Sequence, residues 1–209
     1  MSTPPPPPKR LSAEERKKQI VATTFTLVSQ RGFKSVSVRD VAHAAGINEA
    51  LIYRYFPAKA DLLRAVLTQI VSRQPVASAS LPAGPDEFRA ALDAFIAFFL
   101  DTALADPSKV KTIMYAVMED YPLPDEFNLS KEGTFLNWLY RSIQKGQAEW
   151  GFDPLADPLA AASSFMGGLI FAIMQSAVIR SIPPIDPAPF RRAFLHSFLA
   201  QLCDWPKVA

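Results

Sequence analysis

The chain has 209 residues, of which 49% are hydrophobic, so it has the apolar content of a folded protein and is not wholly disordered. Its 22 basic and 20 acidic residues leave a formal charge of +2, which argues against a uniformly basic or acidic binder unless the charge is unevenly distributed. One cysteine cannot form an intrachain disulfide, and with two histidines it cannot supply a His/Cys zinc cluster. We therefore expect a cytoplasmic protein with no metal and no cofactor.

The chain is expected to begin with a disordered, proline-rich arm over residues 1–10, because Pro4 to Pro8 form an unbroken run. Lys9 and Arg10, at the end of this arm, are either solvated or placed to follow a DNA minor groove. A helix is expected next, because Ser12 and Glu15 have the spacing of a capping box.

Two short helices are expected after this first one, over Ser37 to Ala45 and over Asn48 to Phe56. Ser37 and Asp40 form a second capping box, and Asn48 is a good N-cap. Gly46 lies between the two helices, where a left-handed turn residue is needed. Three short helices with a glycine turn describe a helix-turn-helix unit, whose last helix enters the major groove of DNA.

The residues around this turn resemble the N-terminal domain of the TetR family of transcriptional regulators. The resemblance rests on the sequences VRDVA at 38–42, AGI at 45–47 and LIYRYFPAKADL at 51–62, and it extends over roughly residues 12–70. It implies a homodimer with an N-terminal domain that binds double-stranded DNA and a C-terminal helical domain that binds a small-molecule effector and dimerises.

The resemblance also implies roles for individual residues. Phosphate contacts are implied for the serine and arginine at the start of the second helix, for the two tyrosines of the third and for the lysine at the start of the fourth. Base reading is expected from the start of the third helix and from its arginine, since arginine can bind guanine bidentately. The predicted DNA-binding set is Ser37, Arg39, Asn48, Glu49, Ala50, Leu51, Tyr53, Arg54, Tyr55 and Lys59.

Two features of this set leave alternatives open. Many family members carry serine or threonine with a small residue around positions 48–51, where this chain is more apolar and has the acidic Glu49. Glu49 either accepts a hydrogen bond from cytosine or faces away from DNA. Taken alone, Tyr53 and Tyr55 are ordinary half-buried aromatic residues; within the surrounding sequence, DNA contact is the preferred interpretation.

The second half of the chain is expected to be a larger helical domain, which makes the fold all-α with about nine helices. A Pro-, Ser- and Ala-rich loop over residues 75–85 predicts a division into a DNA-binding domain at 11–73 and an effector domain at 86–209. Helices are expected from Asp86, over residues 109–120, from Phe127 to Trp150, and after two Asp-Pro pairs at Asp157 and Asp186.

The helix after Asp157 carries no charge until Arg180. This stretch is either a membrane-spanning helix or a helix buried in a helical domain. Serines and a glutamine interrupt it, and its continuous apolar part is short, so we favour the core helix and expect no membrane partner.

The aromatic and methionine residues of the second half are either packed core or the lining of a largely apolar ligand pocket. The predicted ligand-binding set is Phe95, Phe99, Met114, Tyr115, Met118, Trp138, Phe165, Phe171 and Gln175. The last two helices are the expected dimer interface, because glycine permits close helix approach and phenylalanine recurs every four residues. The predicted interface set is Gly167, Gly168, Phe190, Phe194 and Phe198.

The charge of the two halves differs in sign. Through Arg73 the chain has 12 basic and 5 acidic residues, and the remainder has 10 basic and 15 acidic residues. We therefore predict a DNA-seeking N-terminal domain and an acidic effector domain. A repressor released from a pseudo-palindromic operator by its effector is the leading hypothesis, activation remains an alternative, and no enzymatic constellation is evident.

Overall fold

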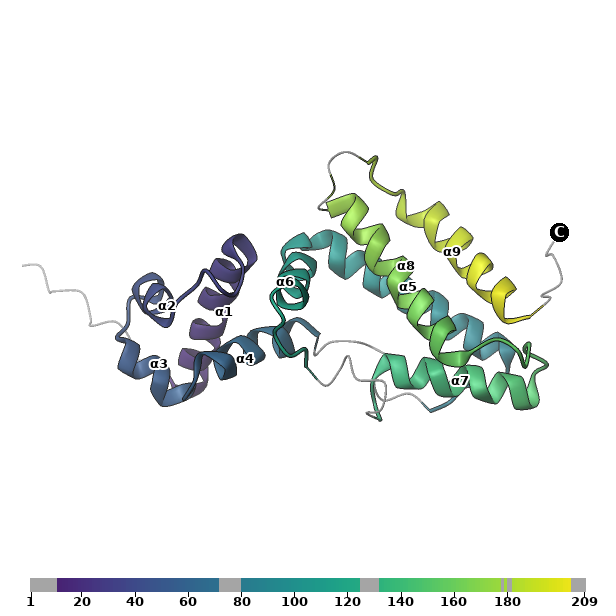
Figure 1. Ribbon diagram of the computed structural model, residues 1–209, viewed down its shortest axis with the longest axis horizontal. Helices are drawn as coiled ribbons and strands as arrows, with labels where there is room; N and C mark the ends of the chain where they lie inside the picture. The colour runs from purple at the N-terminus through teal and green to yellow at the C-terminus, as the bar shows by residue number, and fades with distance from the viewer. Residues whose placement is uncertain (1–10, 72–79, 125–131, 178, 180–181, 204–209) are drawn as a thin grey trace, which may run out of the picture. The chain divides into compact units, whose positions relative to one another are not determined.

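A computed structural model describes residues 11–71, 80–124, 132–177, 179 and 182–203, and within these residues it has nine α-helices and no strand (Figure 1). The prediction of an all-α fold with about nine helices is confirmed. The chain divides into two compact units, Met1–Val66 and Leu67–Ala209. The predicted arm at residues 1–10, with Lys9 and Arg10, lies outside the described residues, as do residues 75–79 of the predicted loop.

The N-terminal unit contains α1 (Ala13–Arg31), α2 (Val38–Ala45), α3 (Glu49–Tyr55) and the first part of α4 (Lys59–Val71). The predicted capping box at the start of α1 is present: Ser12 N–H donates to Glu15 Oε2 at 2.7 Å, and Glu15 N–H donates to Ser12 Oγ at 3.2 Å. The hydrogen bond from the Ser12 backbone N–H, and after it one from the Ser12 side chain, lower the pKa of Glu15. Residues three positions apart therefore decide where α1 begins.

The C-terminal unit contains α5 (Pro85–Ala105), α6 (Pro107–Met118), α7 (Phe135–Glu149), α8 (Pro158–Ala177) and α9 (Pro187–Leu202). Both predicted Asp-Pro starts are present: Asp157 Oδ1 accepts from Leu159 N–H at 2.8 Å, and Asp186 Oδ1 accepts from Ala188 N–H at 3.2 Å. The proline follows each aspartate at the first helical position, where its missing N–H removes no intrahelical bond.

The start of α7 differs from the prediction. A helix was expected from Phe127, whereas α7 begins at Phe135, capped by Thr134, whose Oγ1 accepts from Asn137 N–H at 3.2 Å. Gly133 precedes the cap with a φ of 82°, which a helical residue does not adopt. Residues 125–131 lie outside the described part of the chain.

Aromatic rings fill the core of the C-terminal unit. Phe95 of α5 stacks on Phe135 of α7 with ring centroids 3.4 Å apart, and Phe165 of α8 lies 5.8 Å from Phe135 and 4.7 Å from Phe198 of α9. Helix α5 lies against α6, α8 and α9, while α7 packs on α8. Long-range ring packing between helices therefore holds this unit together.

Helix α8 is long and apolar enough to cross a membrane by length and composition alone, with a mean hydropathy of 1.5 over Pro158–Ser176. Core helices of helical domains pass the same test. Ala162, Phe165, Leu169 and Ile173 of α8 are buried in the aromatic core, while most of its other residues are half-buried or exposed.

Candidate nucleic-acid interface

Helix α2 begins with the second predicted capping box. Asp40 N–H donates to Ser37 Oγ at 3.1 Å, Ser37 N–H donates to Asp40 Oδ2 at 2.8 Å, and the Ser37 hydroxyl donates to the same oxygen at 2.6 Å. The pKa of Asp40 is lowered mainly by the hydroxyl hydrogen bond from Ser37 and then by the backbone one. Ser37 is thus engaged in the cap, and Arg39 follows it as an exposed residue near the N-terminus of α2.

The turn between α2 and α3 has the geometry of a helix-turn-helix. Gly46 adopts the left-handed conformation, with φ 64° and ψ 36°, and Ile47 N–H donates to Ala42 O at 3.0 Å. Asn48 Oδ1 then accepts from Ala50 N–H at 2.9 Å and caps α3. A glycine and an asparagine therefore end one helix and start the next within three residues.

Helix α3 has one buried face and one exposed face. Ile52 and Phe56 are only 1% and 4% exposed, which fixes the helix on the core of its unit. Tyr53, 47% exposed, and Arg54 make no hydrogen bond or ion pair with any part of the chain that the structure describes. Of the other predicted contact residues of the turn and α3, Asn48 and Ala50 are exposed, and Glu49, Leu51 and Tyr55 are half-buried.

Lys59, at the start of α4, has an intrachain partner that sequence reasoning missed. Its Nζ donates to Phe33 O at 2.8 Å, which ties α4 to the turn before α2. A second tie joins α1 to α2, since Gln19 Nε2 donates to Ala45 O at 3.3 Å. Neither contact has a local sequence signal, because each joins residues that are 26 positions apart.

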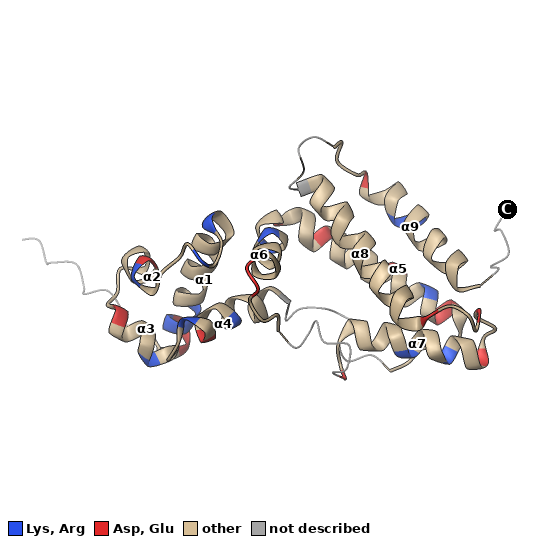
Figure 2. Cartoon of the chain, viewed as in Figure 1, with Lys and Arg blue, Asp and Glu red and all other residues tan. Residues whose placement is uncertain are grey.

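Basic residues occur on the first three helices of the N-terminal unit. Figure 2 shows Lys and Arg positions on α1, α2 and α3, consistent with the 12 basic and 5 acidic residues counted through Arg73. Exposed charges of one sign raise the local concentration of a polyanion and speed its association.

The predicted ligand-binding residues of the C-terminal unit divide into two groups. Five of them gather in or against the aromatic core: Phe95, Phe99, Met114, Trp138 and Phe165. The other four are half-buried or exposed: Lys111 Nζ lies over the Tyr115 ring, Gln175 Nε2 donates to Pro183 O at 2.7 Å, and Met118 and Phe171 are exposed.

The residues predicted to form the dimer interface are partly buried within one chain and partly exposed. Phe198 is buried in the core, and Phe190 and Phe194, whose rings lie 5.3 Å apart, pack partly against it. A Cβ on Gly168 would lie 2.6 Å from the Phe194 ring, so this glycine permits a close approach within one chain. Gly167 is exposed, with nothing within 4 Å of an added Cβ.

The N-terminal fold and its exposed third helix define a protein of the helix-turn-helix class. Residues 20–66 match the family model described as bacterial regulatory proteins, tetR family. The N-terminal domain of the chain is therefore similar to that of the TetR family of regulators.

Two relatives and one solved structure extend the comparison. The regulator EthR of Mycobacterium tuberculosis is 35% identical over 66 residues, a match that spans 32% of this chain and 31% of that protein. EthR of Mycolicibacterium smegmatis is 24% identical over 186 residues, spanning 86% and 82%. The crystal structure of NalD, the secondary repressor of the MexAB-OprM multidrug efflux pump in Pseudomonas aeruginosa, has a TM-score of 0.66 at 18% identity and covers 93% of this chain and 100% of NalD. At that identity the likeness shows the shared fold.

Proposed function

We propose that this protein is a transcriptional repressor that binds a pseudo-palindromic DNA operator as a homodimer and leaves it when a small, largely apolar effector binds. The single observation that carries the proposal is α3, whose buried Ile52 and Phe56 hold it while Tyr53 and Arg54 extend into solvent without a partner in the described residues. A helix fixed in this way can enter a major groove without losing its own packing.

The residues of the proposed DNA-binding surface have different roles. Arg54 reads a guanine, since its guanidinium can donate two hydrogen bonds to one base edge. Arg39 and the Tyr53 hydroxyl contact phosphates and set the register of the protein on the duplex. Ala50 and Leu51, at the start of α3, offer apolar contact to a thymine methyl group.

The dimer is proposed to form through the exposed face of α8. Leu159, Ser163, Gly167 and Phe171 follow each other at intervals of four residues and are all exposed, with Phe171 55% exposed. A self-complementary face of this kind suits a two-fold interface, where the bare backbone at Gly167 allows close approach of two copies. The spacing of two α3 helices would then set the spacing of the operator half-sites.

The effector is proposed to act on the C-terminal unit by favouring an arrangement of the dimer in which the two α3 helices no longer match the half-sites. An effector can only shift this equilibrium by its difference in affinity for the two arrangements. The repressor description of NalD, which shares the fold, supports repression over activation.

The proposal is tested by fluorescence anisotropy with the DNA upstream of the protein's own gene, using shuffled DNA as competitor. We expect Arg54→Ala to weaken specific binding about 5- to 150-fold, the equivalent of about 1–3 kcal/mol for one bidentate base contact. Arg141→Ala is the matched control, because Arg141 is an exposed arginine of the C-terminal unit, and it should bind as the unchanged protein does. Equal affinity of both variants and no preference over shuffled DNA would refute the proposal.

Lys59 needs a test that separates a phosphate contact from a structural tie. Lys59→Gln should lower the salt dependence of DNA binding by about one phosphate if its charge faces DNA. If the hydrogen bond to Phe33 O is its whole role, the salt slope stays unchanged while the unfolding midpoint falls.

A further inference from the structure

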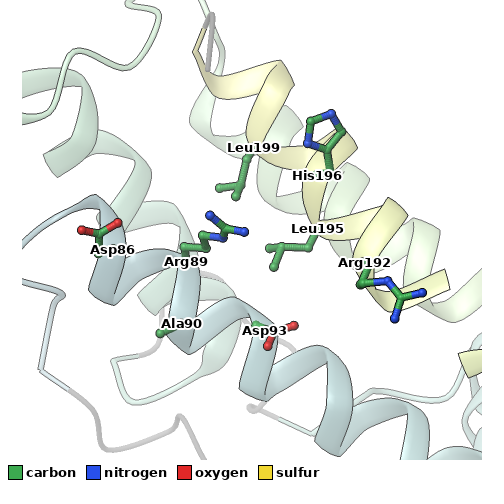
Figure 3. Close-up of a pocket in the computed structure, with 8 residues that line it drawn as sticks. All are labelled: Asp86, Arg89, Ala90, Asp93, Arg192, Leu195, His196 and Leu199. Carbon is green, nitrogen blue, oxygen red and sulfur yellow. The ribbon is translucent and has the colours of Figure 1, made fainter. Parts of the chain in front are cut away.

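A groove of about 370 Å³ lies between α5 and α9 of the C-terminal unit (Figure 3). None of the residues predicted from the sequence to bind a ligand lines it. Its volume falls within the range of about 300–1,000 Å³ that is usual for small-molecule sites. The groove therefore has room for a small ligand outside the aromatic core.

The groove combines an apolar floor with a basic group. Leu195 and Leu199 of α9 are buried and form the floor, one helical turn apart. Arg89 extends from α5 toward α9 above them (Figure 3). A ligand in this groove would meet a guanidinium on one side and hydrocarbon on the other.

The acidic residues of the groove make no direct ion pair with Arg89 in the described part of the chain, although Asp93 attracts Arg89 electrostatically. Asp93, which also lines the groove, is engaged by Arg191 in a bidentate pair: Nε donates to Oδ1 at 2.5 Å, and Nη2 donates to Oδ2. Arg89 makes no hydrogen bond or ion pair within the residues that the structure describes. Arg192 adds a second positive charge on α9, which leaves two arginines against the remaining Asp86.

We propose that this groove binds a small amphipathic carboxylate, with its carboxylate on Arg89 and its hydrocarbon chain on Leu195 and Leu199. Arginine suits this role because its planar fork of donors matches the two oxygens of a carboxylate. Asp93 accepts its hydrogen bonds from Arg191, so the donors of Arg89 are not engaged by Asp93. This binding site is independent of the proposed DNA-binding function and is measured on the protein alone.

Isothermal titration calorimetry of the full chain with octanoate tests the proposal, with 1-octanol as the uncharged probe of equal chain length. We expect saturable octanoate binding, with 1-octanol at least tenfold weaker. Arg89→Ala should weaken octanoate binding at least tenfold, and Arg89→Lys should weaken it less because it keeps the charge but loses the fork. Arg141→Ala should leave it unchanged, since Arg141 pairs with Glu132 at 3.7 Å and does not line the groove.

Three results would overturn the proposal. They are the absence of octanoate binding, equal binding of octanoate and 1-octanol, and unchanged octanoate affinity in Arg89→Ala with circular dichroism like that of the unchanged protein. A change in oligomeric state of Arg89→Ala without a change in octanoate affinity would assign the groove to a contact between protein chains instead. DNA binding is measured in parallel, so a chain that binds octanoate but no operator would refute the proposed function and leave this site standing.

Discussion

In the N-terminal unit, helix ends are set by residues three positions apart, whereas the C-terminal unit is held by groups that lie far apart in the chain. Ser12 with Glu15 and Ser37 with Asp40 begin α1 and α2. In the C-terminal unit, the ion pair of Asp93 and Arg191 joins residues 98 positions apart. The comparison teaches that local hydrogen bonds set where helices begin, whereas the packing of distant helices decides how a larger domain is held together.

The largest expected effect is on the aromatic core. Phe88 is fully buried, and its ring lies 6.0 Å from Trp138, 6.0 Å from Trp150 and 5.6 Å from Phe152. Phe88→Ala should lower the free energy of unfolding of the C-terminal unit by about 3–5 kcal/mol, because it leaves a cavity among these rings. Tryptophan fluorescence in a urea titration measures this unit alone, since all three tryptophans of the chain follow residue 67.

Leu155→Ala is the control for this prediction, because Leu155 is 90% exposed and its loss should change the free energy of unfolding little. Surface substitutions usually lower the free energy of unfolding by less than about 1 kcal/mol. If Phe88→Ala lowers it by no more than that, distant ring packing does not hold this unit together.

The second prediction concerns a close approach of helix and ring. A Cβ on Gly146 of α7 would overlap the buried ring of Phe152, so Gly146→Ala should cost about 1–3 kcal/mol by overpacking, offset in part by about 1 kcal/mol of helix propensity. Thermal unfolding of Gly146→Ala should therefore occur at a lower temperature than that of the unchanged protein.

Gly167→Ala is the matched change, because Gly167 is also helical but has nothing within 4 Å of an added Cβ. A single copy of the chain should gain stability from Gly167→Ala, whereas the dimer proposed through α8 should lose stability, because the added Cβ would separate the two copies. A Gly146→Ala variant at least as stable as the unchanged protein would contradict the close packing of Phe152 on Gly146.

The third prediction tests the turn of the N-terminal unit. Gly46→Ala should cost about 1–2 kcal/mol, since an L-residue pays this for the left-handed conformation and no neighbour would clash with its Cβ. Gly46→Asn should cost less, because asparagine tolerates that conformation. Circular dichroism gives the unfolding midpoints, and equal losses for the two variants would show that backbone conformation is not the cause.

The smallest expected effect is the pH dependence of the α5–α9 ion pair. The hydrogen bonds from Arg191 lower the pKa of Asp93 below its ordinary value of 3.8, so the pair stabilises the folded state above that value. This stability is lost as the pH falls through the lowered pKa. Because both side chains are more than a third exposed, the contribution should be about 1 kcal/mol or less.

Urea titrations between pH 2 and pH 7 measure this contribution, with Asp93→Asn as the comparison. The variant should lack the part of the acid dependence that Asp93 supplies, and the difference between the two proteins should shrink toward low pH. A difference that grows as the pH falls would contradict the assignment.

The sequence by itself determined the class of fold, the two capping boxes, the glycine turn and the two Asp-Pro helix starts. The helix starts and the glycine turn could be predicted because each depends on residues no more than five positions apart, whose hydrogen bonds are local. The family resemblance named the residues of α3, and their proposed contacts with DNA stay predictions that the variants above address.

Only the tertiary structure decided which aromatic residues are core and which are surface. Phe165 and Phe171 look alike in the sequence of α8, yet the first is buried among rings and the second is exposed. The structure likewise separated Gly168, which meets Phe194, from the open Gly167. The tie from Lys59 to Phe33 and the α5–α9 groove belong to the same group, because each depends on how segments distant in the chain pack together.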